Sequence, residues 1–123
     1  MAHTYWNDIT LTFGRNIASL DRDITSYEVR EFIYGTVVPN LTAVGQDAFS
    51  LTHHSGYWKG MHESSFTIRI LCEGDTYEQV LDRCYDIGAE YCDRFNQDSV
   101  LLETRAVNPP TFITADDLTP AAN

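Results

Sequence analysis

Apolar and polar residues alternate along four separate stretches of the chain. Over residues 5–14, Ile9, Leu11 and Phe13 alternate with polar side chains, which is the period-two pattern of a strand with one buried face. The same alternation returns at residues 49–56, at residues 66–70 and from residue 100 onward. We predict four strands, with the second and third joined as a hairpin through the polar link at residues 59–62.

Two stretches of helical periodicity separate these strands. The first opens with the capping-box sequence at residues 25–28 and continues until Pro39-Asn40, which predicts a helix end. The second opens with a similar box at residues 75–78 and ends at residues 96–98. Its apolar stripe consists of Tyr77, Val80, Leu81, Cys84, Ile87, Gly88, Tyr91 and Phe95.

The element order β-α-β-β-α-β predicts an α+β fold of the ferredoxin-like type. In that fold two helices cover one face of a four-stranded antiparallel sheet, and the strands lie in the order four, one, three, two. We assign residues 1–107 to one such domain. Residues 108–123 contain proline and small residues without a period, so we expect a loose tail or an arm laid on a neighbouring molecule.

Strand parity divides the side chains between the helix-covered face and an open face. Because Ile9 and its alternating neighbours face the helices, the intervening residues face the other way. An uncovered face with two leucines favours a homo-oligomer, at least a dimer. The residues expected on the open face are Thr10, Thr12, Arg69, Leu71, Leu101, Glu103 and Arg105.

Length and charge narrow the classes of partner. The 123 residues, 43% of them hydrophobic, fit one domain, and 18 acidic against 8 basic residues give a net charge of −10. This charge disfavours nucleic acid and anionic membranes as partners. No apolar run approaches a membrane span and no signal peptide precedes the domain, so we expect a cytoplasmic protein. The three cysteines lack C-x-x-C spacing and are expected to be reduced core thiols.

The sequence contains no recognisable catalytic or metal-binding motif. No nucleophile can be paired with a base, so we predict a protein that is not an enzyme and uses no cofactor. His53, His54, His62 and Glu63 have the chemistry of zinc ligands. Adjacent strand residues point to opposite faces, however, so we expect no metal site there.

Two arginines and two aromatic residues are candidates for ligand binding. Arg69 and Arg105 should lie on the open face, separated by the first strand, where they could clamp phosphates or pair with acids such as Glu103. Tyr57 and Trp58, which are consecutive residues of the expected hairpin, could stack on a purine or merely shield the core.

Three short motifs resemble a known family. They are Leu11-Thr12-Phe13-Gly14-Arg15-Asn16, then Gly56-Tyr57-Trp58-Lys59-Gly60 with Glu63-Ser64, and then Phe95-Asn96-Gln97-Asp98-Ser99-Val100. Together they resemble a widespread family of small uncharacterised ferredoxin-like proteins and, in its neighbourhood, the first Thoeris anti-defence family of phage proteins. The proline-bearing tail after Val107 departs from that family.

The resemblance implies a binding function. Members of the phage family act as sponges, oligomers that sequester cyclic ADP-ribose immune signals without cleaving them. If the chain shares that role, it acts in the host cytoplasm on a cyclic ADP-ribose-type or cyclic nucleotide signal. The site residues that the resemblance implies are Arg15, Asn16, Tyr57, Glu63, Ser64, Asn96 and Gln97.

Two other functions remain open at this stage. Open-faced ferredoxin-like sheets also host enzymes of small metabolites, with the site between subunits. An acidic surface could instead serve an inhibitor that binds a basic protein. Neither alternative has a residue of its own in the sequence.

Overall fold

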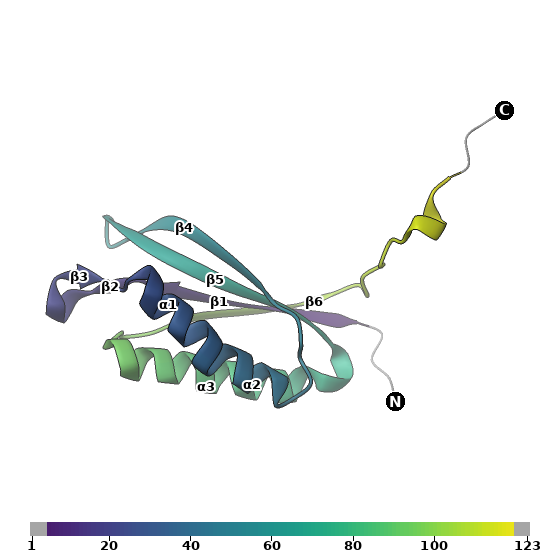
Figure 1. Cartoon of the computed structure of the whole chain (residues 1–123), viewed down its shortest axis with the longest axis horizontal. Coiled ribbons are helices and arrows are strands. Elements are labelled where there is room, and N and C mark those ends of the chain that lie inside the picture. The colour runs from purple at the N-terminus through teal and green to yellow at the C-terminus, as the bar shows by residue number, and fades with distance from the viewer. Residues whose placement is uncertain (1–4, 120–123) are drawn as a thin grey trace.

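The computed structural model of the chain describes residues 5–119, apart from the side chain of Trp58. Four strands form one antiparallel sheet in the order β4-β5-β1-β6, and the helices cover one of its faces (Figure 1). The strands are β1 Trp6–Gly14, β4 Ser50–Trp58, β5 Met61–Glu73 and β6 Leu101–Val107, and the helices are α1 Ser26–Phe32, α2 Val38–Thr42 and α3 Tyr77–Phe95.

The predicted fold class is confirmed. The strand order is the one expected for β-α-β-β-α-β, with β1 between β5 and β6. Thr10 lies opposite Arg69 on one side and Glu103 on the other, so these three residues share the open face as strand parity predicted.

The prediction that Pro39 ends the first helix is wrong. The helical backbone continues through a π turn, Ile33–Val37, into α2, which reaches Thr42. Proline cannot donate the hydrogen bond that an uninterrupted α-helix needs. The Val38 N–H bonds the carbonyl of Ile33 five residues earlier, and this wider turn places Pro39 in the first turn of α2, where no N–H is needed.

The two predicted capping boxes have different outcomes. Thr25 and Glu28 form the first box in full, and the hydrogen bond from Arg22 holds the pKa of Glu28 at about 2. The residues of the second box do not open the helix directly. A 3-10 turn, Gly74–Thr76, precedes α3, and Thr76, the residue before α3, donates its hydroxyl to the Glu73 carbonyl and supplies no side-chain cap.

The hairpin of β4 and β5 is longer than the sequence predicted. Only Lys59 and Gly60 form the turn, both with positive φ, and pairing extends to Trp58 and Met61. A two-residue turn of this kind matches the twist of the strands. The hairpin therefore projects past the end of β1 (Figure 1). A smaller pair, β2 Asn16–Ile17 and β3 Arg22–Asp23, was not predicted.

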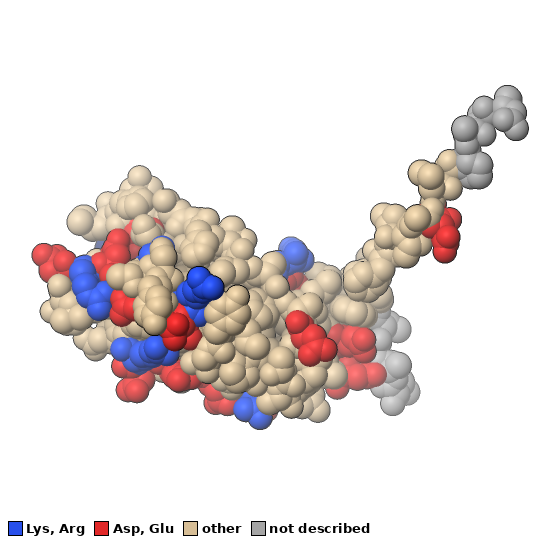
Figure 2. Space-filling model, in the orientation of Figure 1, with Lys and Arg blue, Asp and Glu red and all other residues tan. Residues whose placement is uncertain are grey.

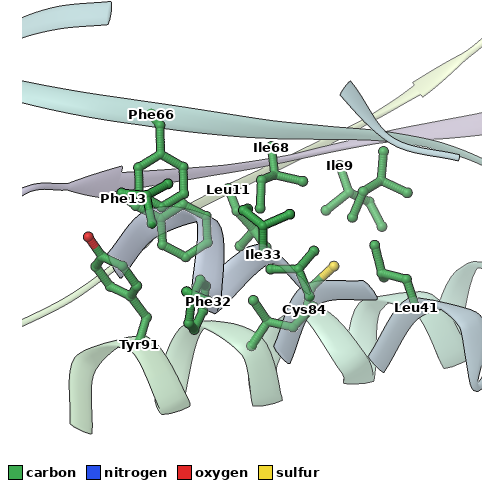
Figure 3. Close-up of a cluster of buried hydrophobic side chains, with 14 of the residues drawn as sticks. Ile9, Leu11, Phe13, Phe32, Ile33, Leu41, Phe66, Ile68, Cys84 and Tyr91 are labelled. Atoms are coloured by element: carbon green, nitrogen blue, oxygen red, sulfur yellow. The ribbon is translucent and has the colours of Figure 1, made fainter. Parts of the chain in front are cut away.

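The core lies between the sheet and the helices (Figure 3). Phe13 lies in this core near the end of β1. Its ring stacks on that of Phe66 with centroids 4.7 Å apart and packs edge-on against the Tyr91 ring with centroids 4.8 Å apart. Cys72 and Cys84 are buried free thiols, and burial raises their pKa values to about 11 and about 12. Such thiols are unreactive, so they contribute packing only.

Residues 108–119 leave the sheet at the end of β6 and point away from the domain (Figure 1). We call this segment the arm. It contains one short 3-10 turn, Ala115–Asp117, which the Thr114 side chain caps. No helix among the described residues is long and apolar enough to cross a membrane.

Candidate functional site

A groove of about 720 Å³ lies at the end of the sheet where β1 stops. We call it the end groove. Its walls come from the end of β1, the segment after it, the β4-β5 hairpin and the loop between α3 and β6. The residues that line it are Thr12, Gly14, Asn16, Ala18, Ser19, His54, Gly56, Tyr57, Lys59, Glu63, Ser65, Asn96, Gln97, Asp98, Ser99 and Leu101.

Five of the ten candidate residues from the sequence line this groove together. They are Asn16, Tyr57, Glu63, Asn96 and Gln97. They come from three motifs that are distant in sequence, so the fold itself assembles them. Ligand sites in proteins have volumes of this size, roughly 300–1,000 Å³.

Glu63 is an unpaired carboxylate of the end groove. It is half-buried beside Gly14, and it makes no hydrogen bond or ion pair with any residue between 5 and 119. A methyl group on Gly14 would overlap Glu63 Oε1 and lie 2.9 Å from its Cδ. Because Gly14 has no side chain, it leaves the space that this carboxylate occupies.

His54 is a groove residue that the sequence analysis did not select. Its Nε2 lies 2.6 Å from Thr67 Oγ1 and its Nδ1 lies 3.0 Å from Ser65 Oγ. Thr67 in turn contacts Thr12 Oγ1 at 3.2 Å. These hydroxyls fix the imidazole on the open face. Cross-strand register, which places Ser65 opposite His54, was the information that the sequence lacked.

Asn96 and Gln97 hold the groove wall together. Asn96 has positive φ at the end of α3, and its Nδ2 donates to Ser19 Oγ at 3.0 Å. Gln97 Nε2 donates to the carbonyls of Asn16 at 2.8 Å and of Phe95 at 3.1 Å. Both amides thus connect the end of α3 to the segment after β1.

Two other candidates, Arg15 and Ser64, do not line the groove. Arg15 turns away, because its Nε and Nη2 both donate to the Ile24 carbonyl at 3.0 and 2.7 Å. Ser64 contributes its backbone, since its carbonyl accepts from the Arg15 N–H. Trp58 ends β4, and its side chain lies outside the described residues.

Arg69 and Arg105 meet on the open face at a shared acid. Asp8 is only 4% exposed, and both of its oxygens accept from Arg69 Nε at 3.0 Å. Arg105 Nη2 reaches the same carboxylate at 3.4 Å. A smaller depression of about 360 Å³ surrounds the three residues, away from the end groove. The acid partner that the sequence analysis named as an alternative is thus Asp8 and not Glu103.

We expect Arg69→Ala to destabilise the fold by about 1–3 kcal/mol, because it leaves the buried Asp8 carboxylate without its main donor. Arg105→Ala should cost less, since its side chain is 72% exposed and makes one longer contact. Urea unfolding of both variants measures this. In an Asp8→Asn background the Arg69 effect should shrink, and an undiminished loss there would contradict the assignment.

The end groove has the chemistry of a polar small-molecule site. Its described lining residues include one aromatic ring, one imidazole and three charged groups, Lys59, Glu63 and Asp98, but no arginine. In the part of the chain that the structure describes, no three or more His, Cys, Asp or Glu residues are grouped to hold a metal ion.

The fold and the groove define a small ferredoxin-like α+β domain with a polar groove at one end of its open-faced sheet. The chain belongs to the DUF3574 family, described as proteins of unknown function, because the model of that family matches residues 8–109. No curated protein matches the sequence.

Solved structures share the fold at low sequence identity. A phage SAM lyase in complex with S-methyl-5′-thioadenosine is 17% identical with a TM-score of 0.62, covering 89% of this chain and 94% of that one. A phage SAM lyase in its apo state is 13% identical with a TM-score of 0.59, covering 90% and 95%. A nitrogen regulatory PII-like protein from Thiomonas intermedia K12 is 8% identical, with a TM-score of 0.49 and coverage of 89% and 97%, too distant to support an argument.

These structures correct one prediction from the sequence. The prediction that the chain is not an enzyme is contradicted, because a lyase is built on the same fold. The absence of catalytic motifs from the sequence therefore does not exclude an enzyme. Nothing in the comparisons tests the resemblance to the Thoeris anti-defence family, which stays a prediction.

Proposed function

We propose that the chain binds a nucleoside-derived small molecule in the end groove. The observation that carries this proposal is the unpaired, half-buried Glu63 carboxylate, seated on Gly14 in the same groove as Tyr57. A carboxylate accepts two hydrogen bonds from the adjacent hydroxyls of a ribose, as acidic residues do in dinucleotide sites. An aromatic ring such as that of Tyr57 can stack on any nucleobase.

The charge of the groove favours a nucleoside over a nucleotide. Lys59 is the one cation among its described lining residues, against Glu63 and Asp98, and Arg15 is occupied by the Ile24 carbonyl. Phosphate sites in proteins normally present arginine forks or clustered backbone N–H groups. A ligand that is neutral or cationic beyond its ribose fits this balance better. The phage SAM lyase of the same fold binds S-methyl-5′-thioadenosine, a neutral nucleoside, which supports the same choice.

The groove also carries an imidazole and a carboxylate, His54 and Glu63, which are side chains that serve as general acids and bases in enzymes. Hydroxyls on both nitrogens fix the His54 ring. General acid and base groups need to be positioned before their substrate arrives. We therefore include turnover among the properties to be measured on the bound nucleoside.

A thermal-shift panel tests the proposal. The panel contains adenosine, S-methyl-5′-thioadenosine, S-adenosylmethionine, cyclic AMP and cyclic ADP-ribose isomers, and each ligand is recovered and analysed afterwards. At 100 times its dissociation constant a ligand adds about 2.7 kcal/mol of stability. We expect the nucleosides without phosphate to raise the melting temperature and Glu63→Gln to remove that rise.

Each result of the panel has a separate meaning. A shift with cyclic ADP-ribose and none with nucleosides would contradict our proposal and support the signal-sequestering function predicted from the family resemblance. Recovery of altered ligand would identify an enzyme. No shift with any compound would exclude nucleoside binding by the isolated chain.

A further inference from the structure

The arm exposes an unusual concentration of large apolar side chains. Phe112, Ile113 and Leu118 are 77%, 82% and 81% exposed within seven consecutive residues. The segment is nonetheless locally organised, because the Asp117 carboxylate accepts from the Thr114 N–H at 2.9 Å. Its only charged side chains are Asp116 and Asp117, which lie together on an otherwise uncharged segment (Figure 2). Contiguous exposed apolar surface of this kind marks an interaction site.

The domain of the same chain does not receive the arm. Val107 pairs with Trp6, at the opposite end of β1 from Gly14 and the end groove. From there the arm continues away from the sheet (Figure 1). The surface that it covers must therefore belong to another molecule.

The open face is self-complementary in charge. Glu103 and Arg105 lie on it two residues apart, and Glu103 makes no ion pair within residues 5–119. In a two-fold dimer, when one residue contacts a second residue of the other copy, the second residue of the first copy makes the same contact in return. Two copies can stack through their open faces about a two-fold axis that lies between the faces, runs perpendicular to the strands and passes near residue 104. This axis sets Glu103 of each copy opposite Arg105 of the other.

The same axis brings the arm of one copy to the groove of the other. It reverses the strand direction, so the Val107 end of β6 lies over the Leu101 end of the second copy, where the end groove opens. The arm has twelve residues, 108–119, and can extend about 40 Å. That reach exceeds the length of the seven-residue strand β6, about 23 Å.

We propose that two copies of the chain pack through their open faces about this axis, and that the arm of each copy lies in the end groove of the other. Phe112 and Ile113 then cover exposed apolar side chains at the edge of the groove, such as Leu101, which is 57% exposed in one copy. Each groove is complete only in the dimer. The proposal needs no ligand, so it stands or falls separately from nucleoside binding.

Light scattering of the full chain and one double variant tests the assembly. We expect twice the 14.0 kDa mass of one chain at micromolar concentration. The double variant Phe112→Ser/Ile113→Ser should raise the dissociation constant of the dimer at least about tenfold. Tyr27→Ser removes a 70% exposed ring from α1 on the helix side and is the control, with no expected change. A monomeric wild type, or a double variant that assembles normally, would overturn the proposal.

Photocrosslinking tests where the arm lies. Benzoylphenylalanine at position 112, in a mixture of isotopically light and heavy chains, should link light to heavy chains at residues 54–65 or 96–101. The same group at position 27 should form no such link. Crosslinks within one chain, or between chains at the helices, would refute the placement of the arm even if the protein is a dimer.

Discussion

Gly14→Ala is expected to abolish most ligand binding in the end groove without unfolding the domain. The new methyl group would overlap the Glu63 carboxylate, which must rotate away because the backbone beneath it is fixed by pairing with Ser65. Losing a charge-assisted hydrogen bond costs about 1.5–3 kcal/mol, or roughly 10- to 150-fold in affinity. Stability should hold or rise slightly, since the displaced atoms are the end of a flexible side chain and alanine suits a strand better than glycine.

Calorimetric titration with the nucleoside found by the panel, together with the melting temperature, measures both effects. Gly35→Ala is the matched control, because a methyl group there meets nothing within 4 Å and Gly35 lies on the far, helical side. In a Glu63→Gln background, Gly14→Ala should cost no further affinity. A lower melting temperature with unchanged affinity would show that Gly14 serves the fold and not the site.

The fold could be predicted because each of its rules is local. Alternation around Ile9, Leu11 and Phe13 identifies the strand, its buried face and, with the element order, its central place in the sheet. The helical stripe of α3 was equally clear, although Leu81 proves only half-buried, so its truncation should cost less than that of the buried Phe95. Periodicity gives the face of a residue, but not its depth.

The site was harder to predict because it depends on register. The hairpin turn consists of only Lys59 and Gly60. This short turn places Glu63 beside Gly14 and so forms the end groove. A lysine with positive φ has no signature in the sequence, because that conformation is unfavourable for it. This turn sets the paired lengths of β4 and β5, and with them the distance between the motif that contains Glu63 and the motif that contains Gly14.

The arginine pair shows the same limit. Strand parity placed Arg69 and Arg105 on one face, and this much was confirmed by the register. Their partner Asp8 belongs to the alternation of β1, but only cross-strand pairing shows that it lies beside Arg105 and is buried between the two guanidiniums. Whether they also contact a ligand stays a prediction, for which affinity measured on the alanine variants is the test.

Phe13→Ala is expected to cause the largest loss of stability, about 3–5 kcal/mol. The Phe13 ring is fully buried and contacts three other rings: it stacks on Phe66 and meets the edges of Tyr91 and Phe32 with centroids 4.8 and 5.8 Å away (Figure 3). These rings come from the sheet and from both helical segments, so little collapse can fill the space left behind. A loss of this size is a large share of the 5–15 kcal/mol that typically holds a domain together.

Urea unfolding, with the free energy extrapolated to water, measures the loss. Tyr57→Ala is the matched control, because it removes an aromatic ring that is 77% exposed and should change stability by less than about 0.5 kcal/mol. Phe13→Leu should recover part of the loss, since it restores apolar volume without the ring stacking.

The Tyr91 hydroxyl donates to the Gly14 carbonyl at 2.6 Å, so Phe13→Ala should also loosen the floor of the end groove and weaken nucleoside binding. Equal stability of Phe13→Ala and Tyr57→Ala would mean that the aromatic cluster does not hold the sheet to the helices.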